Sequence, residues 1–269
     1  MDRFSEAEVT DRAAGLAYYG FLALFPVLIV IVAVLALVGS YPETYESIVD
    51  TLNDAAPGAA VDLIDGALKD ALADRGSATS LLGVGLVLAF ISGSGGAAAA
   101  IRALEAIEKN RGASGVARGW LTRIWLTLAL MFLLMVGFIA LLVAGPIFSS
   151  IAEHAGLGSG TRSAVSLLRY PIGLLALMAA FLLLYWRGPG GRRKAPRKYL
   201  PGAALGAGLW VLVSIGFSIY VSNFSSYDAT YGALGAVIVL LIWLYLGNIA
   251  FLLGGLFNVE HQRATGRSK

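Results

Sequence analysis

The feature that most constrains this chain is an uncharged apolar stretch near its C-terminus, Leu234 to Phe257. In a helix with a rise of ~1.5 Å per residue, its 24 residues are enough to cover the ~30 Å hydrocarbon core of a bilayer. Three of its small residues, Gly247, Ala250 and Gly254, recur at spacings of three and four and therefore share one helical face. Small residues let helix backbones approach closely in lipid. The stretch therefore predicts a membrane-spanning helix that packs inside a bundle.

The composition of the whole chain predicts the same class. Apolar residues make up 58% of the 269 residues and charged residues 14%, whereas soluble domains have about 25% charged residues. The absence of cysteine excludes disulfides, thiolate metal sites and cysteine nucleophiles. His154 and His261 fall in loops predicted on opposite faces of the membrane, so they cannot share a metal. We therefore expect a polytopic membrane protein with no metal and no cofactor.

Five further apolar segments bring the predicted number of crossings to six. The crossings are at about 16–38, 81–101, 124–146, 170–186, 200–221 and 234–257. They make residues 1–269 a single transmembrane domain, an all-α bundle of six helices. Pro26 predicts a bend or a helix start inside the first crossing, because proline removes a backbone hydrogen bond. The second crossing is interrupted by the run Ser92 to Gly96, and Tyr170-Pro171 starts the fourth.

Residues 39–80 form the longest polar segment, and this segment is acidic. Its apolar residues follow helical spacing in two short runs, so we expect two short amphipathic helices. Their acidic faces would be repelled by anionic lipid, which favours a cap over the external mouth of the bundle.

The positive charges predict the orientation. If both termini are cytoplasmic, the cytoplasmic segments hold 16 of the 20 lysines and arginines. The positive-inside rule therefore favours six crossings with both ends in the cytoplasm. Because the basic residues are segregated by loop, the high isoelectric point indicates membrane topology, and we expect no nucleic-acid partner.

Six crossings also divide into two triplets of opposite orientation. The middle helix of each triplet, 81–101 and 200–221, is its glycine-rich member. Paired glycine-interrupted segments at corresponding positions are typical of inverted-repeat transporters. The alternative is that these glycines serve only close packing.

Several motifs together resemble the YihY/BrkB family of bacterial inner-membrane proteins. They are the run Ala13 to Pro26, Arg169-Tyr-Pro171, Leu200-Pro-Gly-Ala203, Tyr231-Gly-Ala-Leu-Gly235, Trp243-Leu-Tyr245 and the closing Asn258. The resemblance implies a six-helix integral protein of the bacterial inner membrane, often described as a transporter, with members linked to serum resistance or lipid export. It brings no agreed substrate. One departure is Leu104-Glu105, where the family pattern leads us to expect Leu-Asn.

Polar residues in or beside the apolar spans form the candidate substrate pathway. They are Tyr18, Tyr19, Ser92, Ser94, Asn223, Tyr227, Asp228, Tyr231 and Asn248. Hydroxyl and amide groups need partners in lipid, so these side chains should face the bundle interior or an aqueous cavity. Apart from Asp228, these residues form a neutral, aromatic lining, which suits a polyol, a zwitterion or a lipid head group. Asp228 lies close to a helix end, where the alternatives are interfacial anchoring and a part in a proton or ion relay. The alternative is interfacial tyrosines plus interhelical hydrogen bonds that serve packing alone.

Two further sets of residues have simpler predicted roles. The helix-packing glycines are Gly85, Gly93, Gly202, Gly206, Gly247 and Gly254, and their small-residue faces leave a homodimer open. The predicted lipid head-group contacts are Arg192, Arg193, Lys194, Arg197 and Lys198, for which the alternative is a topology determinant and nothing more.

These patterns predict a membrane protein that moves a solute or lipid, without ATP because the chain has no P-loop motif. The alternative is a non-transporting membrane component that supports envelope assembly through a partner. We do not expect an enzyme. A ribonuclease label has been attached to the family, but metal-dependent phosphodiester cleavage needs several gathered carboxylates. The predicted cytoplasmic side offers Glu105, Glu108, Glu260 and scattered N-terminal acids, with no HxH or DxD pattern.

Overall fold

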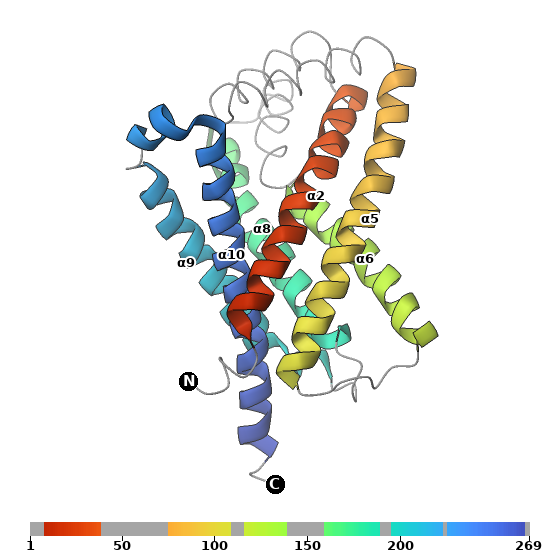
Figure 1. Ribbon diagram of the computed structural model, residues 1–269, viewed down its shortest axis with the longest axis vertical. Coiled ribbons are helices and arrows are strands. Elements are labelled where there is room, and N and C mark those ends of the chain that lie inside the picture. The colour runs from red at the N-terminus through yellow and green to blue at the C-terminus, as the bar shows by residue number, and fades with distance from the viewer. Residues whose placement is uncertain are drawn as a thin grey trace. The chain divides into compact units, whose positions relative to one another are not determined.

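The computed structural model describes residues 8–38, 75–108, 116–138, 159–188, 195–222 and 225–266. Over these ranges the chain is helical and contains no strand, which confirms the predicted all-α fold (Figure 1). The α helices are α2 (Val9–Val38), α5 (Arg75–Glu108), α6 (Val116–Phe138), α8 (Ser159–Arg187), α9 (Leu200–Ser222) and α10 (Ser225–Gly266). A short 3₁₀ helix, η2 (Pro196–Lys198), precedes α9.

Each of the six predicted crossings falls on one of these α helices. Within the described ranges, four segments are long and apolar enough to cross a membrane. They are Thr79–Glu108 of α5, Tyr170–Arg187 of α8, Leu200–Tyr220 of α9 and Val237–Thr265 of α10, while α6 contributes a shorter apolar helix, Trp120–Val136.

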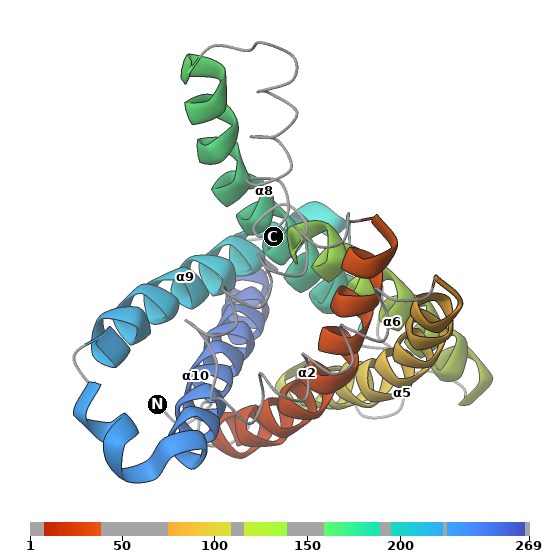
Figure 2. The ribbon, with the colours of Figure 1, turned by 90° about the horizontal axis from the view of Figure 1, so that it is seen from above.

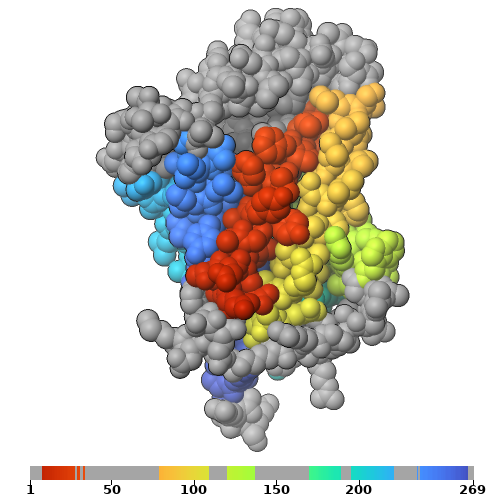
Figure 3. Space-filling model, viewed as in Figure 1, coloured from red at the N-terminus to blue at the C-terminus, as the bar shows by residue number. Residues whose placement is uncertain are grey.

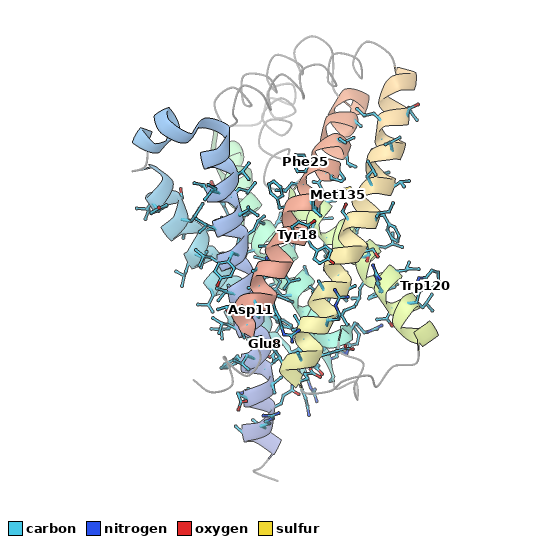
Figure 4. All side chains as sticks on the ribbon, viewed as in Figure 1. Glu8, Asp11, Tyr18, Phe25, Trp120 and Met135 are labelled. Atoms are coloured by element: carbon cyan, nitrogen blue, oxygen red, sulfur yellow. The ribbon has the colours of Figure 1, made fainter. Side chains whose placement is uncertain are left out.

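Large apolar side chains are exposed along one face of several helices. On α6 the exposed residues Leu121, Trp125, Leu128, Phe132 and Met135 recur every three or four positions. α9 shows the same pattern at Leu212, Ile215 and Ile219. In the side-chain view, Trp120 and Met135 are labelled on α6 and Tyr18 and Phe25 on α2 (Figure 4). Soluble proteins rarely expose such continuous apolar faces, whereas a helix in lipid does so as a rule.

Three helices differ in extent from the sequence prediction. α2 neither begins nor ends at Pro26, which lies inside the helix. α5 runs without a break through Ser92 to Gly96, so the glycines that interrupt the apolar pattern do not interrupt the helix. α10 is a single helix of 42 residues that extends past the predicted crossing at both ends. The intrinsic helix propensity of single residues predicts helix ends only weakly, because contacts with other parts of the protein override it.

Some predictions fall outside the described residues. These include the amphipathic helices of the acidic segment before Arg75 and the end of the third predicted crossing after Phe138. The inverted repeat and the single domain over 1–269 stay predictions.

The chain divides into two compact units, and each is assembled from segments distant in sequence. The first unit comprises Met1–Ala13, Ala97–Val213 and Gly247–Lys269, and the second comprises Ala14–Gly96 and Ser214–Leu246. α9 and α10 run next to each other (Figure 2). They touch within each unit, through Gly202 and Asn258 in the first and through Ser214 and Trp243 in the second.

In the first unit, α6 packs against α8. Leu126 and Thr127 of α6 are fully buried, and Thr127 donates its hydroxyl hydrogen to the Arg123 carbonyl at 2.8 Å. On α8 the buried residues Ala176, Ala180 and Leu184 follow helical spacing. The polar group of Thr127 is thus satisfied within its own helix, as burial requires.

In the second unit, α2 and α5 approach closely at Gly85. A Cβ atom at this glycine would lie 2.8 Å from Ile29 Cγ2 and 3.3 Å from the backbone nitrogen of Val30. The side chains of Val84, Val87 and Ile91 on α5 are exposed. Part of α5 is visible at the surface in the space-filling view (Figure 3). α5 therefore presents a glycine to its neighbour and aliphatic side chains outward.

We expect Gly85→Ala to lower the apparent melting temperature of the purified full chain in detergent. The added methyl group would overlap Ile29 and press on the α2 backbone, and overpacking of this kind destabilises by ~1–3 kcal/mol. For a chain of this size that corresponds to ~2–4 °C per kcal/mol.

Gly83→Ala is the matched control, because nothing lies within 4 Å of a Cβ at Gly83 on the same helix. Alanine is a better helix former than glycine by ~1 kcal/mol, so this variant should melt at or above the wild-type temperature. Equal melting temperatures for the two variants would contradict the close approach at Gly85.

Candidate functional site

The candidate pathway residues that the structure brings together lie in the second unit, where Tyr19 of α2 meets the glycine–serine segment of α5. A Cβ at Gly95 would lie 2.9 Å from Tyr19 Cε1, and one at Gly96 would lie 3.6 Å from Tyr19 Cβ. The phenol ring of Tyr19 therefore occupies space that any larger residue at position 95 would fill. The glycines of the segment from Ser92 to Gly96 leave room for an aromatic ring beside α5, a helix that is long enough to span a membrane.

Ser92 and Ser94 lie on the same segment of α5 and are half-buried, as is Gly93. Ser94 already takes part in an interaction within the structure. A serine in a membrane helix can return its hydroxyl to its own backbone or offer it to a neighbouring group. Together with Tyr19, these serines give the segment neutral hydrogen-bonding groups and an aromatic face.

Tyr18 and Tyr19 differ in exposure, although the sequence placed both in the pathway. Their rings meet edge to face with centroids 5.8 Å apart. Tyr18, labelled in Figure 4, is 58% exposed. Tyr19 is half-buried and lies against α5. Tyr19 is therefore the residue of this pair for which a contact with the glycine–serine segment is observed.

The other predicted pathway residues lie in other parts of the chain. Asn223 lies outside the described residues, and Tyr227, Asp228 and Tyr231 lie on α10 in a part whose side chains are not described. Asn248 belongs to the first unit, is half-buried and takes part in an interaction.

Four of the predicted packing glycines lie in the first unit, where three of them surround one contact between α9 and α10. A Cβ at Gly202 would overlap Asn258 and the carbonyl oxygen of Gly254. A Cβ at Gly206 would lie 3.0 Å from the hydroxyl oxygen of Tyr185. Gly247, which precedes Gly254 on α10, lies against the indole of Trp210.

Tyr185 of α8 fills the space that these glycines leave. Its ring lies against Gly255 and stacks on Phe251 with centroids 5.2 Å apart, and its hydroxyl group donates to the Phe251 carbonyl oxygen at 2.5 Å. The ring of Phe181, one turn earlier on α8, is also close to Phe251. Three helices therefore meet around a tyrosine whose only polar group bonds to a helix backbone.

Asn258 of α10 caps the start of α9. Its Oδ1 accepts the backbone N–H of Gly202 at 2.9 Å, and its Nδ2 donates to the carbonyl of Tyr199 at 3.1 Å. The first N–H groups of a helix have no partner within that helix, and Tyr199, which precedes α9, has no side chain suited to capping. An amide from another helix supplies the missing acceptor and is itself 2% exposed.

The described basic residues of the predicted head-group contacts are Arg197 and Lys198, both exposed on η2. The carbonyl of Lys198 accepts a hydrogen bond from Gln262 Nε2 of α10 at 3.3 Å. Arg192, Arg193 and Lys194 lie outside the described residues.

Sequence reasoning did not single out Tyr185. The available signal was a residue with a polar end placed close to the end of an apolar span, where such residues usually find a partner when buried. The sequence did single out Asn258 as a closing residue, but the bond to Gly202 joins residues 56 positions apart and has no local signature. Among the described side chains, no three His, Cys, Asp or Glu residues are grouped so that they could hold a metal ion.

Long apolar helices, outward-facing aliphatic side chains and buried polar groups bonded to helix backbones define a polytopic α-helical membrane protein. The chain belongs to the BrkB family, because the family's sequence model, described as Virulence factor BrkB, matches residues 1–269. The resemblance that its sequence motifs indicate is therefore confirmed.

The chain is 32% identical to "Putative ribonuclease-like protein YfkH" of Bacillus subtilis (strain 168), over 98% of this chain and 94% of that protein. It is 29% identical to a UPF0761 membrane protein of Alkalilimnicola ehrlichii and 28% identical to one of Xanthomonas campestris pv. campestris (strain B100). The matches cover 100% and 94% of this chain but 60% and 57% of those two relatives. No solved structure matches the chain.

We expect Asn258→Ala to destabilise the protein by ~2–3 kcal/mol, because it removes the cap of α9 and leaves a buried N–H group without an acceptor. The measurement is thermal unfolding of the purified full chain in detergent. Gln262→Ala is the control, since Gln262 lies one turn further along α10 and its bond to Lys198 is exposed. A loss of stability no larger for Asn258→Ala than for Gln262→Ala would contradict the assigned role of the cap.

Proposed function

We propose that this protein moves a solute or a lipid across or within the bacterial cytoplasmic membrane, without ATP hydrolysis. The observation that carries the proposal is the contact of Tyr19 with Gly95 and Gly96, beside the half-buried Ser92 and Ser94. Polar residues inside membrane spans are rare and usually mark a substrate path or an interhelical contact. Membership of a family of membrane proteins is in keeping with this function but does not select it.

The chemistry of the segment favours a neutral or zwitterionic cargo. Serine hydroxyls and a phenol ring offer hydrogen bonds and an apolar face, which match a polyol or a lipid head group. Acidic and histidine side chains of the described spans lie near their ends, at Glu105 and Glu108 of α5 and at Glu260 and His261 of α10. A proton relay needs such groups near mid-membrane, so a proton-driven pump has little support. No P-loop occurs in the sequence, which supports transport without ATP.

The proposed location is the inner membrane, with both termini in the cytoplasm. The distribution of the 20 lysines and arginines supports this orientation through the positive-inside rule. The proposed partners are membrane lipids and the unidentified substrate. The proposal leaves open whether the protein forms a homodimer, and it includes no nucleic-acid partner.

A non-transporting role in envelope assembly is the second candidate. It is favoured by the first unit, where the buried polar groups of Thr127, Tyr185 and Asn258 all bond to helix backbones and therefore act as packing contacts. If Ser92 and Ser94 act in the same way, the protein would work through a partner, with the acidic segment 39–80 as the contact surface.

The name of the Bacillus relative raises ribonuclease activity as a further question. We propose that this chain is not an enzyme. Purified protein incubated with RNA and Mg²⁺ or Zn²⁺ should give no cleavage above that of a mock purification from the same host. Cleavage that follows the protein peak and is abolished by EDTA would contradict this proposal.

The transport proposal is tested by single cysteines, since the chain has none of its own. Ser94→Cys should react with a membrane-impermeant maleimide added from either side, and a transported solute should protect it. Maleimide reacts with the thiolate, so labelling requires water to reach the position.

Two controls make the labelling interpretable. Leu212→Cys on α9 is 66% exposed at a position that we assign to lipid, so it should stay unlabelled from both sides. Arg197→Cys on η2 should react from one side only. If Ser94→Cys is unreactive from both sides while Arg197→Cys reacts, the serines are packing contacts and the envelope-assembly candidate takes precedence.

A further inference from the structure

At the end of α8, in the first unit, the guanidinium group of Arg187 lies over two aromatic rings. The guanidinium carbon of Arg187 is 3.9 Å from the ring centroid of Trp186 and 5.2 Å from that of Trp125 on α6. Both distances fall within the ~6 Å range of cation–π attraction. The packing of α6 against α8 brings Trp125 to Arg187 across 62 positions of sequence.

This guanidinium has no carboxylate partner among the described residues. Its Nε is buried and has no hydrogen-bond partner. In contrast, Arg12 pairs with Glu8, which directly precedes α2, and Arg263 pairs with Glu260 on α10. A buried or half-buried cation is normally paired, because the charge loses hydration when it leaves water.

Two features of α8 explain why the positive charge of Arg187 is tolerated, but they do not explain its contact with two indole rings. Arg187 is the last residue of the helix, where the macrodipole favours a positive charge. It also lies at the end of a candidate span, where a long basic side chain can reach the interface. Neither feature requires the plane of the guanidinium to be fixed, whereas contact with two indole rings restricts it.

A guanidinium with a fixed plane presents its N–H donors as a fork, which matches the spacing of two phosphate oxygens. Trp125 is 46% exposed, so its ring is also open to neighbouring apolar groups. A phosphate next to an apolar chain is the chemistry of a phospholipid at the membrane interface. We propose that Arg187, Trp125 and Trp186 form a binding site for the phosphate of an anionic glycerophospholipid.

This site does not depend on the proposed transport, because a lipid bound here can stabilise the protein whether or not anything is moved. It also differs from the basic residues 192–198. Those were predicted as lipid head-group contacts or as a topology determinant, whereas this site depends on the orientation of one guanidinium.

The test is the affinity of the purified full chain in detergent for phosphatidylglycerol and for phosphatidylcholine, measured by native mass spectrometry. The wild-type protein should prefer phosphatidylglycerol about fivefold, the effect of ~1 kcal/mol for one basic residue at an anionic surface. Arg187→Gln should abolish the preference. Arg263→Gln should retain it, because Arg263 already pairs with Glu260.

Two variants separate orientation from charge, and they also carry the test if Arg187→Gln does not fold. Arg187→Lys keeps the charge but loses the planar fork, and Trp125→Leu keeps an apolar side chain but removes one ring. Both should lose most of the preference. A wild-type preference in Arg187→Gln, or in both Arg187→Lys and Trp125→Leu, would overturn the site.

Inorganic phosphate distinguishes the two sources of the ligand. An excess of it should leave phosphatidylglycerol bound, because it lacks the acyl chains that contact the apolar surface. Complete displacement of the lipid by inorganic phosphate would overturn the assignment to a lipid and indicate a soluble phosphate compound.

Discussion

Inside a bilayer no water is available to backbone groups, and every N–H and C=O must find a partner in the protein. The contact of Asn258 with the start of α9 meets this requirement at the point where a helix cannot meet it alone. One amide side chain accepts from Gly202 and donates to Tyr199, and both bonds reach from α10 to the chain around the first turn of α9. Pro201, the second residue of α9, has no N–H and so reduces the number of groups that need a partner. The motif Leu200-Pro-Gly-Ala203 therefore has a structural explanation in the cap.

In each unit a tyrosine ring packs against glycines of a neighbouring helix, but the polar groups around the two rings differ. In the first unit, Tyr185 lies against glycines of α9 and α10 and gives its hydroxyl hydrogen to a backbone carbonyl. In the second, Tyr19 lies against Gly95 and Gly96 in a segment that also carries two half-buried serines. The first arrangement is a packing contact with its polar group fully used. The second combines close packing with neutral polar groups in mid-span, and for this reason the transport proposal rests on α5 and α2.

The aromatic residues at the end of α8 have a separate role from those in its middle. Tyr185 is directed into the contact with α9 and α10, while Trp186 and Arg187, the next two residues, form the cation–aromatic group with Trp125 of α6. The end of α8 therefore contributes both to the packed interior and to the proposed lipid site at the membrane interface. A phospholipid held by Arg187 would extend the contact between α6 and α8 to the surrounding membrane.

The sequence by itself determined the class of protein and the positions of its helices. Uncharged runs long enough to span lipid, such as Leu234 to Phe257, depend only on local composition, and each of the six fell on a helix. Family membership also followed from motifs that can be read in order along the chain. The glycine–serine run in α5 was expected to interrupt its crossing, yet the helix continues through it and Tyr19 packs on two of its glycines.

Only the tertiary structure decided which polar residues meet. Tyr18 and Tyr19 are adjacent in sequence, but one is exposed and the other packs on α5, because successive residues of a helix point in different directions. The hydrogen-bond partners of Asn258 and Tyr185 lie more than 50 positions away, as does Trp125 from Arg187, and no local pattern specifies such pairings. Lipid burial is fixed by composition within one segment, whereas hydrogen bonds and ring contacts between helices depend on how separate segments are brought together.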